Sequence, residues 1–240
     1  MRPLEQHGEF LTLLNCFPDS SLTGLRISGI ILENCDEMTG IRKSGRMEVE
    51  EMIKTKEDLK RYLAIEKPLY IPQNLKDRLI FMLIGDVKLD TYRFVKYLRY
   101  EEYHHNQPGL LHKLLRVYYW RKRYRLGQKL GTEMWDNTIE EGLHIYHARN
   151  TMTNSAAKIG RNCIMHGNNI VGNNGLSQKC PVLGDNVRLG YGAMIFGDVT
   201  IADNVTVAAG AIVVHSVLEP GVTVAGVPAK IVGRPKNPKE

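Results

Sequence analysis

The sequence has few cysteines and no long hydrophobic run. Its 240 residues contain four cysteines, which form neither a Cys-x-x-Cys pair nor a dense framework: Cys16, Cys35, Cys163 and Cys180. This scatter predicts free thiols in a reducing compartment. The longest strongly apolar run, residues 79–84, is too short to cross a bilayer. The first residues lack the apolar core and cleavage site of a secretory signal, so we expect a cytoplasmic protein.

The composition argues against disorder and leaves several classes of partner open. Hydrophobic residues make up 43% of the chain and charged residues 24%, which is enough to build a core. The formal net charge of +6 suits a polyanionic partner. Coenzyme A, nucleic acid and anionic lipid all fit that description, so charge alone does not choose between them. From the rest of the chain we expect a small-molecule acceptor and no nucleic acid.

The chain changes character near residue 130. Residues 1–51 form an extension whose structure the sequence does not predict. Residues 52–130 are rich in charges and carry apolar residues at helical spacing. Residues 131–235 are rich in Gly, Asn, Val and Ile, and residues 236–240 form a charged tail. We therefore expect a helical region followed by a β domain.

Punctuating residues divide the helical region. Thr55 is a good N-cap for a first helix. Pro68 and Pro72 are expected to interrupt the helical pattern. Pro108 and Gly109 indicate a turn. Gly127 is expected to be the C-cap of the last helix.

That last helix, 110–126, mixes cations with aromatic residues. The cations are Arg116, Arg121, Lys122, Arg123 and Arg125, and the aromatic residues are Tyr118, Tyr119, Trp120 and Tyr124. One interpretation is a patch that contacts a membrane surface or nucleic acid. The other is a solvated basic face whose aromatic residues pack on the neighbouring domain. We favour the second interpretation, because aromatic residues at this spacing are more often core.

A six-residue repeat dominates the second half of the chain. Aliphatic residues recur at Ile159, Met165, Val171, Leu183, Leu189, Ile195, Ile201, Val207 and Val213. Four residues after most of them comes a small or β-branched residue: Cys163, Val187, Ala193, Val199, Val205, Ala211 and Val217. Such a fixed period indicates a solenoid.

Six residues make one short strand and one tight corner, so three repeats close a coil. The aliphatic side chains point inward and stack on those of neighbouring coils, while Gly or Asn supplies the unusual corner angles. The parallel strands then stack at about 4.8 Å. The repeat predicts a β-helix from about 139 to 232. Residues 172–181 lack an inward aliphatic residue, and we expect a loop there, where function often lies.

The repeat, the loop and the closing residues AGVPAKIVGRP resemble the hexapeptide-repeat acyltransferases, specifically the serine acetyltransferase group. The match is best from 142 to 235, and it is closest to shorter members associated with polysaccharide biosynthesis. The resemblance implies a mainly β fold, a left-handed parallel β-helix with a helical N-terminal region. It also implies a homotrimer and acetyl-CoA as co-substrate, with no metal expected.

The resemblance implies site residues as well. His147 falls on the group's catalytic histidine, and His166 is a second catalytic candidate. Imidazole suits a general base that takes a proton from an acceptor hydroxyl. The cofactor-binding candidates are Tyr191, Gly192, Ala209 and Lys230. His147 and His166 are one coil plus one residue apart, so we expect them nearly above one another.

Two departures concern the acceptor. The enzymes of cysteine biosynthesis have a second histidine in the loop and an aspartate just before the catalytic histidine. This chain has Cys180 and Tyr146 at those places, which are therefore the substrate-binding candidates. The acceptor hydroxyl could belong to L-serine, as in cysteine biosynthesis, or to a sugar or polysaccharide precursor.

Two other functions remain open from the sequence. Some β-helices of this repeat are zinc hydratases, and His144, His147 and His166 are candidate ligands for such a metal. The coil could also be a non-catalytic binding protein. Bound zinc would favour the first alternative, and failure to bind coenzyme A would favour the second.

Overall fold

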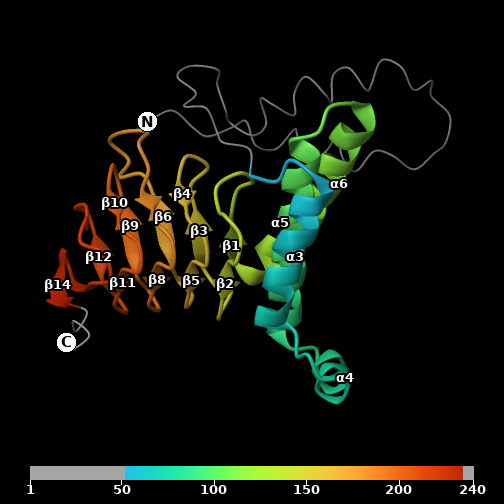
Figure 1. Ribbon diagram of the computed structural model, residues 1–240, viewed down its shortest axis with the longest axis horizontal. Helices are drawn as coiled ribbons and strands as arrows, with labels where there is room; N and C mark the ends of the chain where they lie inside the picture. The colour runs from blue at the N-terminus through green and yellow to red at the C-terminus, as the bar shows by residue number, and fades with distance from the viewer. Residues whose placement is uncertain (1–51, 235–240) are drawn as a thin grey trace, which may run out of the picture. The chain divides into compact units, whose positions relative to one another are not determined.

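The computed structural model describes residues 52–234, so the expectations for residues 1–51, with Cys16 and Cys35, and for the tail at 236–240 lie outside it. The described part of the chain begins with four helices, seen in Figure 1: α3 (Lys56–Tyr70), α4 (Leu75–Leu83), α5 (Val87–His105) and α6 (Leu110–Leu130). None of the helices within 52–234 is long and apolar enough to cross a membrane.

Fourteen short strands follow the helices. They are β1 (Thr132–Glu133), β2 (His144–Ile145), β3 (Thr151–Thr153), β4 (Lys158–Ile159), β5 (Ile164–Met165), β6 (Ile170–Gly172), β7 (Val182–Leu183), β8 (Arg188–Leu189), β9 (Met194–Phe196), β10 (Thr200–Ile201), β11 (Thr206–Val207), β12 (Ile212–Val213), β13 (Thr223–Gly226) and β14 (Ala229–Gly233).

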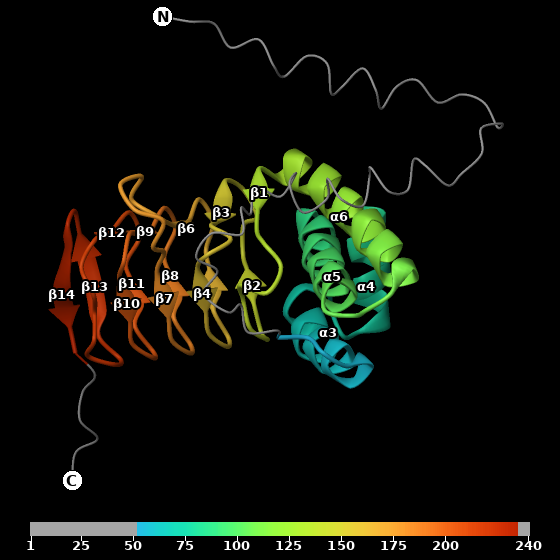
Figure 2. The same cartoon turned by 90° about the horizontal axis from the view of Figure 1, so that it is seen from above.

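The strands form a parallel β-helix with three sheets. The five-stranded sheet has the order β1-β3-β6-β9-β12, the three-stranded sheet β10-β7-β4, and the six-stranded sheet β14-β13-β11-β8-β5-β2. From β4 to β12, consecutive strands enter the three sheets in turn, and only β13 and β14 pair antiparallel. Figure 2 shows the coils stacked side by side, with the helices at the end of the stack that carries β1 and β2.

The core of the coil follows the predicted repeat. All nine aliphatic positions from Ile159 to Val213 are at most 3% exposed, and all seven small positions from Cys163 to Val217 are at most 9% exposed. Each inward side chain lies in register with the one in the next coil, as Leu189 does with Val207. The six-residue interpretation is confirmed at every one of these positions.

Asparagines make one corner of the coil. Asn162, Asn186 and Asn204 have φ angles of 57°, 57° and 60°, in the left-handed region that asparagine tolerates better than most residues. Their side chains form a ladder, because the amide of Asn162 donates to Asn186 and that of Asn186 donates to Asn204, both at 3.2 Å. The ladder holds three successive coils together at this edge.

The expected loop is present between β6 and β7. Ile164 pairs with Arg188, 24 residues on, whereas Arg188 pairs with Thr206, 18 residues on. The longer coil therefore carries six extra residues. They leave the stack within 173–181, where no strand is found.

The helix boundaries confirm one expectation and correct another. Thr55 caps α3 as predicted, and forms a capping box with Asp58. The expectation that Pro68 interrupts the helix is wrong, because α3 continues through it to Tyr70. Pro68 lies in the last turn, where its missing N–H removes only one intrahelical hydrogen bond. Pro72 follows the C-cap, Ile71.

Gly127 is not the C-cap that the sequence suggested. Helix α6 continues to Leu130, and Gly131 ends it with a left-handed φ of 65°. Gly127 is buried inside the helix, where an added Cβ would lie 2.5 Å from the Thr132 carbonyl oxygen and 3.2 Å from Cε2 of Phe94. Glycine is needed here for the close approach of α6 to α5 and β1.

We expect Gly127→Ala to lower the free energy of unfolding by about 1–3 kcal/mol, the usual cost of overpacking. The clash with backbone outweighs the higher helix propensity of alanine, which favours the substitution by about 1 kcal/mol. Urea unfolding measures the change. The matched control is Gly172→Ala, whose Cβ would meet Asn154 Cβ at an ordinary 3.7 Å. Equal stabilities of the two variants would contradict this account of Gly127.

Buried ion pairs attach the helices to the first coils. The guanidinium of Arg99 bonds the carboxylates of Glu66 and Glu102, and all three residues are fully buried. It also donates to the carbonyl oxygens of Ile139, at 2.7 Å, and Glu140, at 2.8 Å. Burial raises the pKa of Glu102 to about 7, against the opposing effect of Arg99. The end of the coil is thus covered by charged groups that are paired with each other.

Candidate active site

One outer face of the six-stranded sheet carries the predicted histidines. Inward residues such as Met165 and Leu189 alternate with outward ones, so the residue after each inward aliphatic side chain faces out. In successive coils these outward residues are Tyr146, His166, Gly190, Ala208 and Ala225, aligned by the strand register. We call this set the His166 strip.

Aromatic rings stack at the start of the strip. The rings of Tyr146 and His166 are parallel, with an interplanar angle of 3° and centroids 4.7 Å apart. His144 lies on the other side, with its centroid 4.2 Å from that of Tyr146. Tyr70 of α3 meets His144 edge-on at 5.4 Å. The stack fixes the orientation of the His166 ring, which is half-buried.

Tyr70 anchors this stack to the backbone of the first coils. Its hydroxyl donates to the carbonyl oxygen of Leu143 at 2.8 Å and accepts from the N–H of Ile145 at 2.9 Å. Burial lowers the pKa of His144, and Lys88 and His166 add to the effect. His144 therefore favours its neutral form beside Tyr146. Tyr70 was missed from the sequence, since its contact with a residue more than 70 positions away leaves no local signal.

The expectation that His147 lies over His166 is wrong. His144 pairs with Ile164, which sets the coil length at 20 residues and places Tyr146, not His147, beside His166. His147 instead lies beside Gly167, where an added Cβ would be 3.0 Å from the His147 Cβ. His147 is exposed at the corner that follows the strip.

Beyond His166 the strip contains only small residues. Gly190 admits no side chain, because an added Cβ would lie 2.5 Å from the backbone nitrogen of Ala209. Ala208 and Ala225 follow in the next coils, and Ala225 pairs with Lys230 on β14. Four strand spacings separate His166 from Lys230, roughly 19 Å at about 4.8 Å each. Gly190 and Ala208 fit the repeat's preference for a small residue after the aliphatic one, which is the sequence signal for this strip.

The predicted cofactor-binding residues lie beside the far part of the strip. Tyr191 is 55% exposed at the corner after Gly190, and its carbonyl oxygen accepts from the N–H of Gly210. Gly192 has a φ of 73°, and its N–H donates to the Gly167 carbonyl oxygen at 3.0 Å. Ala209 and Lys230 are exposed. The structure thus brings these four residues to the strip and the corner next to it.

Cys180, a predicted substrate-binding residue, lies at the end of the loop. Its side chain is 8% exposed and belongs to the hydrophobic core. The thiol contacts the carbonyl oxygen of Gln178 at 3.7 Å, and burial raises its pKa. The structure therefore places the Cys180 thiol in the core, whereas Tyr146, the other predicted substrate-binding residue, is 39% exposed.

The candidate metal ligands do not converge. Residues 52–234 contain no group of three His, Cys, Asp or Glu side chains that could hold a metal ion. The ring of Tyr146 lies between those of His144 and His166, stacking at 4.2 Å and 4.7 Å respectively. A site that needs both imidazoles on one ion is therefore not formed by this arrangement.

No family model matches the sequence, but several individual proteins do. The chain is 42% identical over 66 residues to a serine acetyltransferase of Buchnera aphidicola, which is 28% of this chain and 25% of that protein. It is 31% identical over 103 residues to the Escherichia coli serine acetyltransferase, or 42% of this chain and 37% of that protein. A Synechococcus elongatus serine acetyltransferase is 29% identical over 98 residues, or 40% of each chain. The chain spans a quarter to two fifths of these curated relatives.

Solved structures show the same fold over more of the chain. The Neisseria gonorrhoeae serine acetyltransferase matches with a TM-score of 0.56 and 22% identity, covering 77% of this chain and 70% of that one. The Brucella abortus enzyme in complex with coenzyme A gives a TM-score of 0.54 and 19% identity, covering 75% and 70%. Sequence and fold thus point to one group, and the chain is a homologue of the serine acetyltransferases.

Proposed function

We propose that this protein is a cytoplasmic, acetyl-CoA-dependent O-acetyltransferase built on a left-handed β-helix. The observation that carries the proposal is the His166 strip. It places an imidazole at one end, small residues along its length, and the ammonium of Lys230 at the other end. A long, thin substrate with a reactive end and a phosphorylated end fits such a strip. The relative in complex with coenzyme A supports this choice of donor.

The proposed chemistry uses His166 as general base. Its neutral imidazole takes the proton from the acceptor hydroxyl, which is a poor nucleophile while protonated. The acceptor oxygen then attacks the thioester carbonyl, a C–O bond forms and the C–S bond breaks. The imidazolium returns the proton to the departing thiolate, so that the products are the acetyl ester and coenzyme A. Gly190 and Ala208 leave space for the pantetheine arm, and Lys230 binds a phosphate.

The resemblance favours His147 as the base, whereas the geometry favours His166. Only His166 is aligned with Gly190 and Ala208 by strand register. Its ring is held by the stack on Tyr146, whereas His147 is exposed at the corner. A fixed ring orientation is what proton transfer in a defined direction requires. We therefore propose His166 as the base and His147 as a residue that contacts the acceptor.

Both acceptor classes have support. Solved relatives include a soybean serine acetyltransferase complexed with serine, at a TM-score of 0.54 and 20% identity. The partly exposed ring of Tyr146, stacked on His166, offers a flat surface of the kind on which a sugar ring can pack. Tyr146 also carries no charge to bind the ammonium group of serine. The acceptor is therefore either L-serine or a sugar hydroxyl of a polysaccharide precursor.

A thiol-release assay with acetyl-CoA tests the proposal. We expect turnover with L-serine or with a member of a panel of free and nucleotide-linked sugars. L-Alanine is the matched control for L-serine, because it lacks only the hydroxyl. Turnover with L-serine would show that Tyr146 and Cys180 can replace the usual substrate-binding residues. Thiol release no faster with any hydroxyl compound than with buffer would contradict O-acetyl transfer.

We also propose that the chain assembles as a homotrimer through the outer face of the five-stranded sheet. Met152, Ile170, Met194 and Ile212 are aligned there in successive coils, and Phe196 lies beside them. Met152 is 43% exposed although it is apolar. Such a continuous apolar stripe on a sheet surface is typical of a subunit interface.

A further inference from the structure

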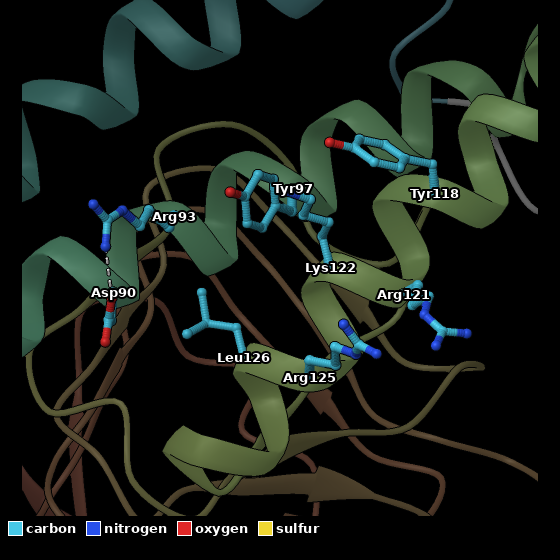
Figure 3. A pocket seen from close by; sticks show the side chains of 8 residues that line it. All are labelled: Asp90, Arg93, Tyr97, Tyr118, Arg121, Lys122, Arg125 and Leu126. Carbon is cyan, nitrogen blue, oxygen red and sulfur yellow. Dashed lines mark hydrogen bonds and ion pairs between the residues drawn. The ribbon is translucent and has the colours of Figure 1, made fainter. Parts of the chain in front are cut away.

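A groove between α5 and α6 lies outside the proposed active site. Its volume is about 730 Å³, and its lining, labelled in Figure 3, comes only from these two helices: Asp90, Arg93, Tyr97, Tyr118, Arg121, Lys122, Arg125 and Leu126. None of the residues of the His166 strip lines it. The groove is large enough for a small organic ligand.

The groove is strongly positive. Four of its eight lining residues are cations, and Asp90 is the one carboxylate among them. Asp90 is already paired, because it accepts from Lys129 at 2.6 Å and from Arg93 at 3.1 Å. These two cations hold the pKa of Asp90 below its usual range, with the Lys129 hydrogen bond the larger effect. Asp90 therefore does not neutralise the cations on α6.

The α6 cations of the groove are available to a ligand. Arg121 and Arg125 are exposed, and neither forms an ion pair with any residue of the described part of the chain. Guanidinium groups bind phosphate oxygens with two parallel hydrogen bonds. Two such groups one helical turn apart on α6 can hold two neighbouring phosphates.

Aromatic rings shape the groove and place its lysine. The ammonium of Lys122 lies 5.1 Å from the ring centroid of Tyr118 and 6.0 Å from that of Tyr97, so it is attracted to both. Figure 3 shows Lys122 extending from α6 toward Tyr97 on α5. Leu126 adds an apolar wall. A cation held between ring faces, with further cations nearby, favours a compact anion over an extended one.

The concave form separates this site from a membrane-binding surface. A bilayer is flat on this scale and would meet the exposed helix face, whereas these residues surround a hollow between two helices. The same hollow is too small for a nucleic-acid duplex, whose major groove is itself about 12 Å wide. We propose that the groove binds a small molecule through a diphosphate group. Nucleoside diphosphates and nucleotide-linked compounds share that group.

Isothermal titration of the full chain with inorganic pyrophosphate tests the proposal. We expect saturable binding that weakens with salt, and weaker binding of orthophosphate. In Arg121→Gln/Arg125→Gln the pyrophosphate affinity should fall by at least about tenfold, since two charge-assisted contacts are lost. The matched control, Lys60→Gln/Lys113→Gln, removes the same charge from exposed positions outside the groove and should bind like the wild type.

Titration with adenosine diphosphate separates two sources of the ligand. Tighter binding of the nucleotide than of pyrophosphate, reduced by Tyr118→Leu, would identify a nucleotide as the occupant. Equal binding of both would identify the diphosphate alone. The proposal is overturned if pyrophosphate does not saturate the protein, if both double variants lose affinity equally, or if only anionic phospholipid vesicles bind. Equal melting temperatures of the variants ensure that affinity, not folding, is compared.

Discussion

Replacing His166 with alanine is expected to lower kcat/KM for acetyl transfer by about 10²- to 10⁴-fold, the usual contribution of a general base. The half-buried imidazole of His166 is held against Tyr146 at the start of a strip of small residues, and alanine would leave no group there to take the acceptor proton. The fall should appear mainly in kcat, because the base acts in the transition state more than in binding. Steady-state thiol release measures both constants.

His147→Ala is the matched control for that prediction. His147 is one residue beyond the strip and exposed, so its removal should raise KM for the acceptor with a smaller change in kcat. The reverse result, a near-normal His166→Ala enzyme and an inactive His147→Ala enzyme, would assign the base to His147, as the sequence resemblance suggests. Unchanged melting temperatures are needed for both variants, since His166 also takes part in the aromatic stack.

Replacing Arg99 with methionine is expected to lower the free energy of unfolding by about 3–5 kcal/mol, the usual cost of breaking a buried ion pair. The substitution would leave the carboxylates of Glu66 and Glu102 buried without their cation. The carbonyl oxygens of Ile139 and Glu140 would lose a donor as well. Urea unfolding should be measured near pH 8. Protonation of Glu102, whose pKa is about 7, would reduce the loss at lower pH.

Arg61→Met provides the comparison for Arg99. Arg61 also pairs with a carboxylate next to the first coils, Glu141, at 2.9 Å, but its side chain is 55% exposed. A solvent-exposed pair contributes about 0–1 kcal/mol, so this variant should be nearly as stable as the wild type. If the two variants differed by less than about 1 kcal/mol, the Arg99 network would not be what attaches the helices to the coil.

The repeat made the coil predictable. Each six-residue unit is its own local signal, because burial at positions such as Leu189 and Val207 follows directly from spacing. The loop at 172–181 was equally visible, as an interruption of that spacing. The strip was only partly visible, since Gly190 and Ala208 look like ordinary corner residues until the register aligns them with His166.

Features that depend on distant contacts could not be predicted. The first full coil has 20 residues instead of 18, and that difference alone moves Tyr146 into the place expected for His147. Gly127 looked like a helix end, although its role is to let α6 approach Thr132. Arg99 resembles a surface residue of a charged helix, and nothing local marks it as fully buried.

The coil of 24 residues shows that distance along the chain and position in the site are independent here. His166 donates its N–H directly to the Leu189 carbonyl oxygen at 3.0 Å, so the relation between His166 and Gly190 is set by the sheet and not by the residues that connect them. The loop between β6 and β7 can therefore lengthen, shorten or change its composition while the reacting groups stay in place. Such a scaffold lets acceptor preference vary between homologues without rebuilding the chemistry.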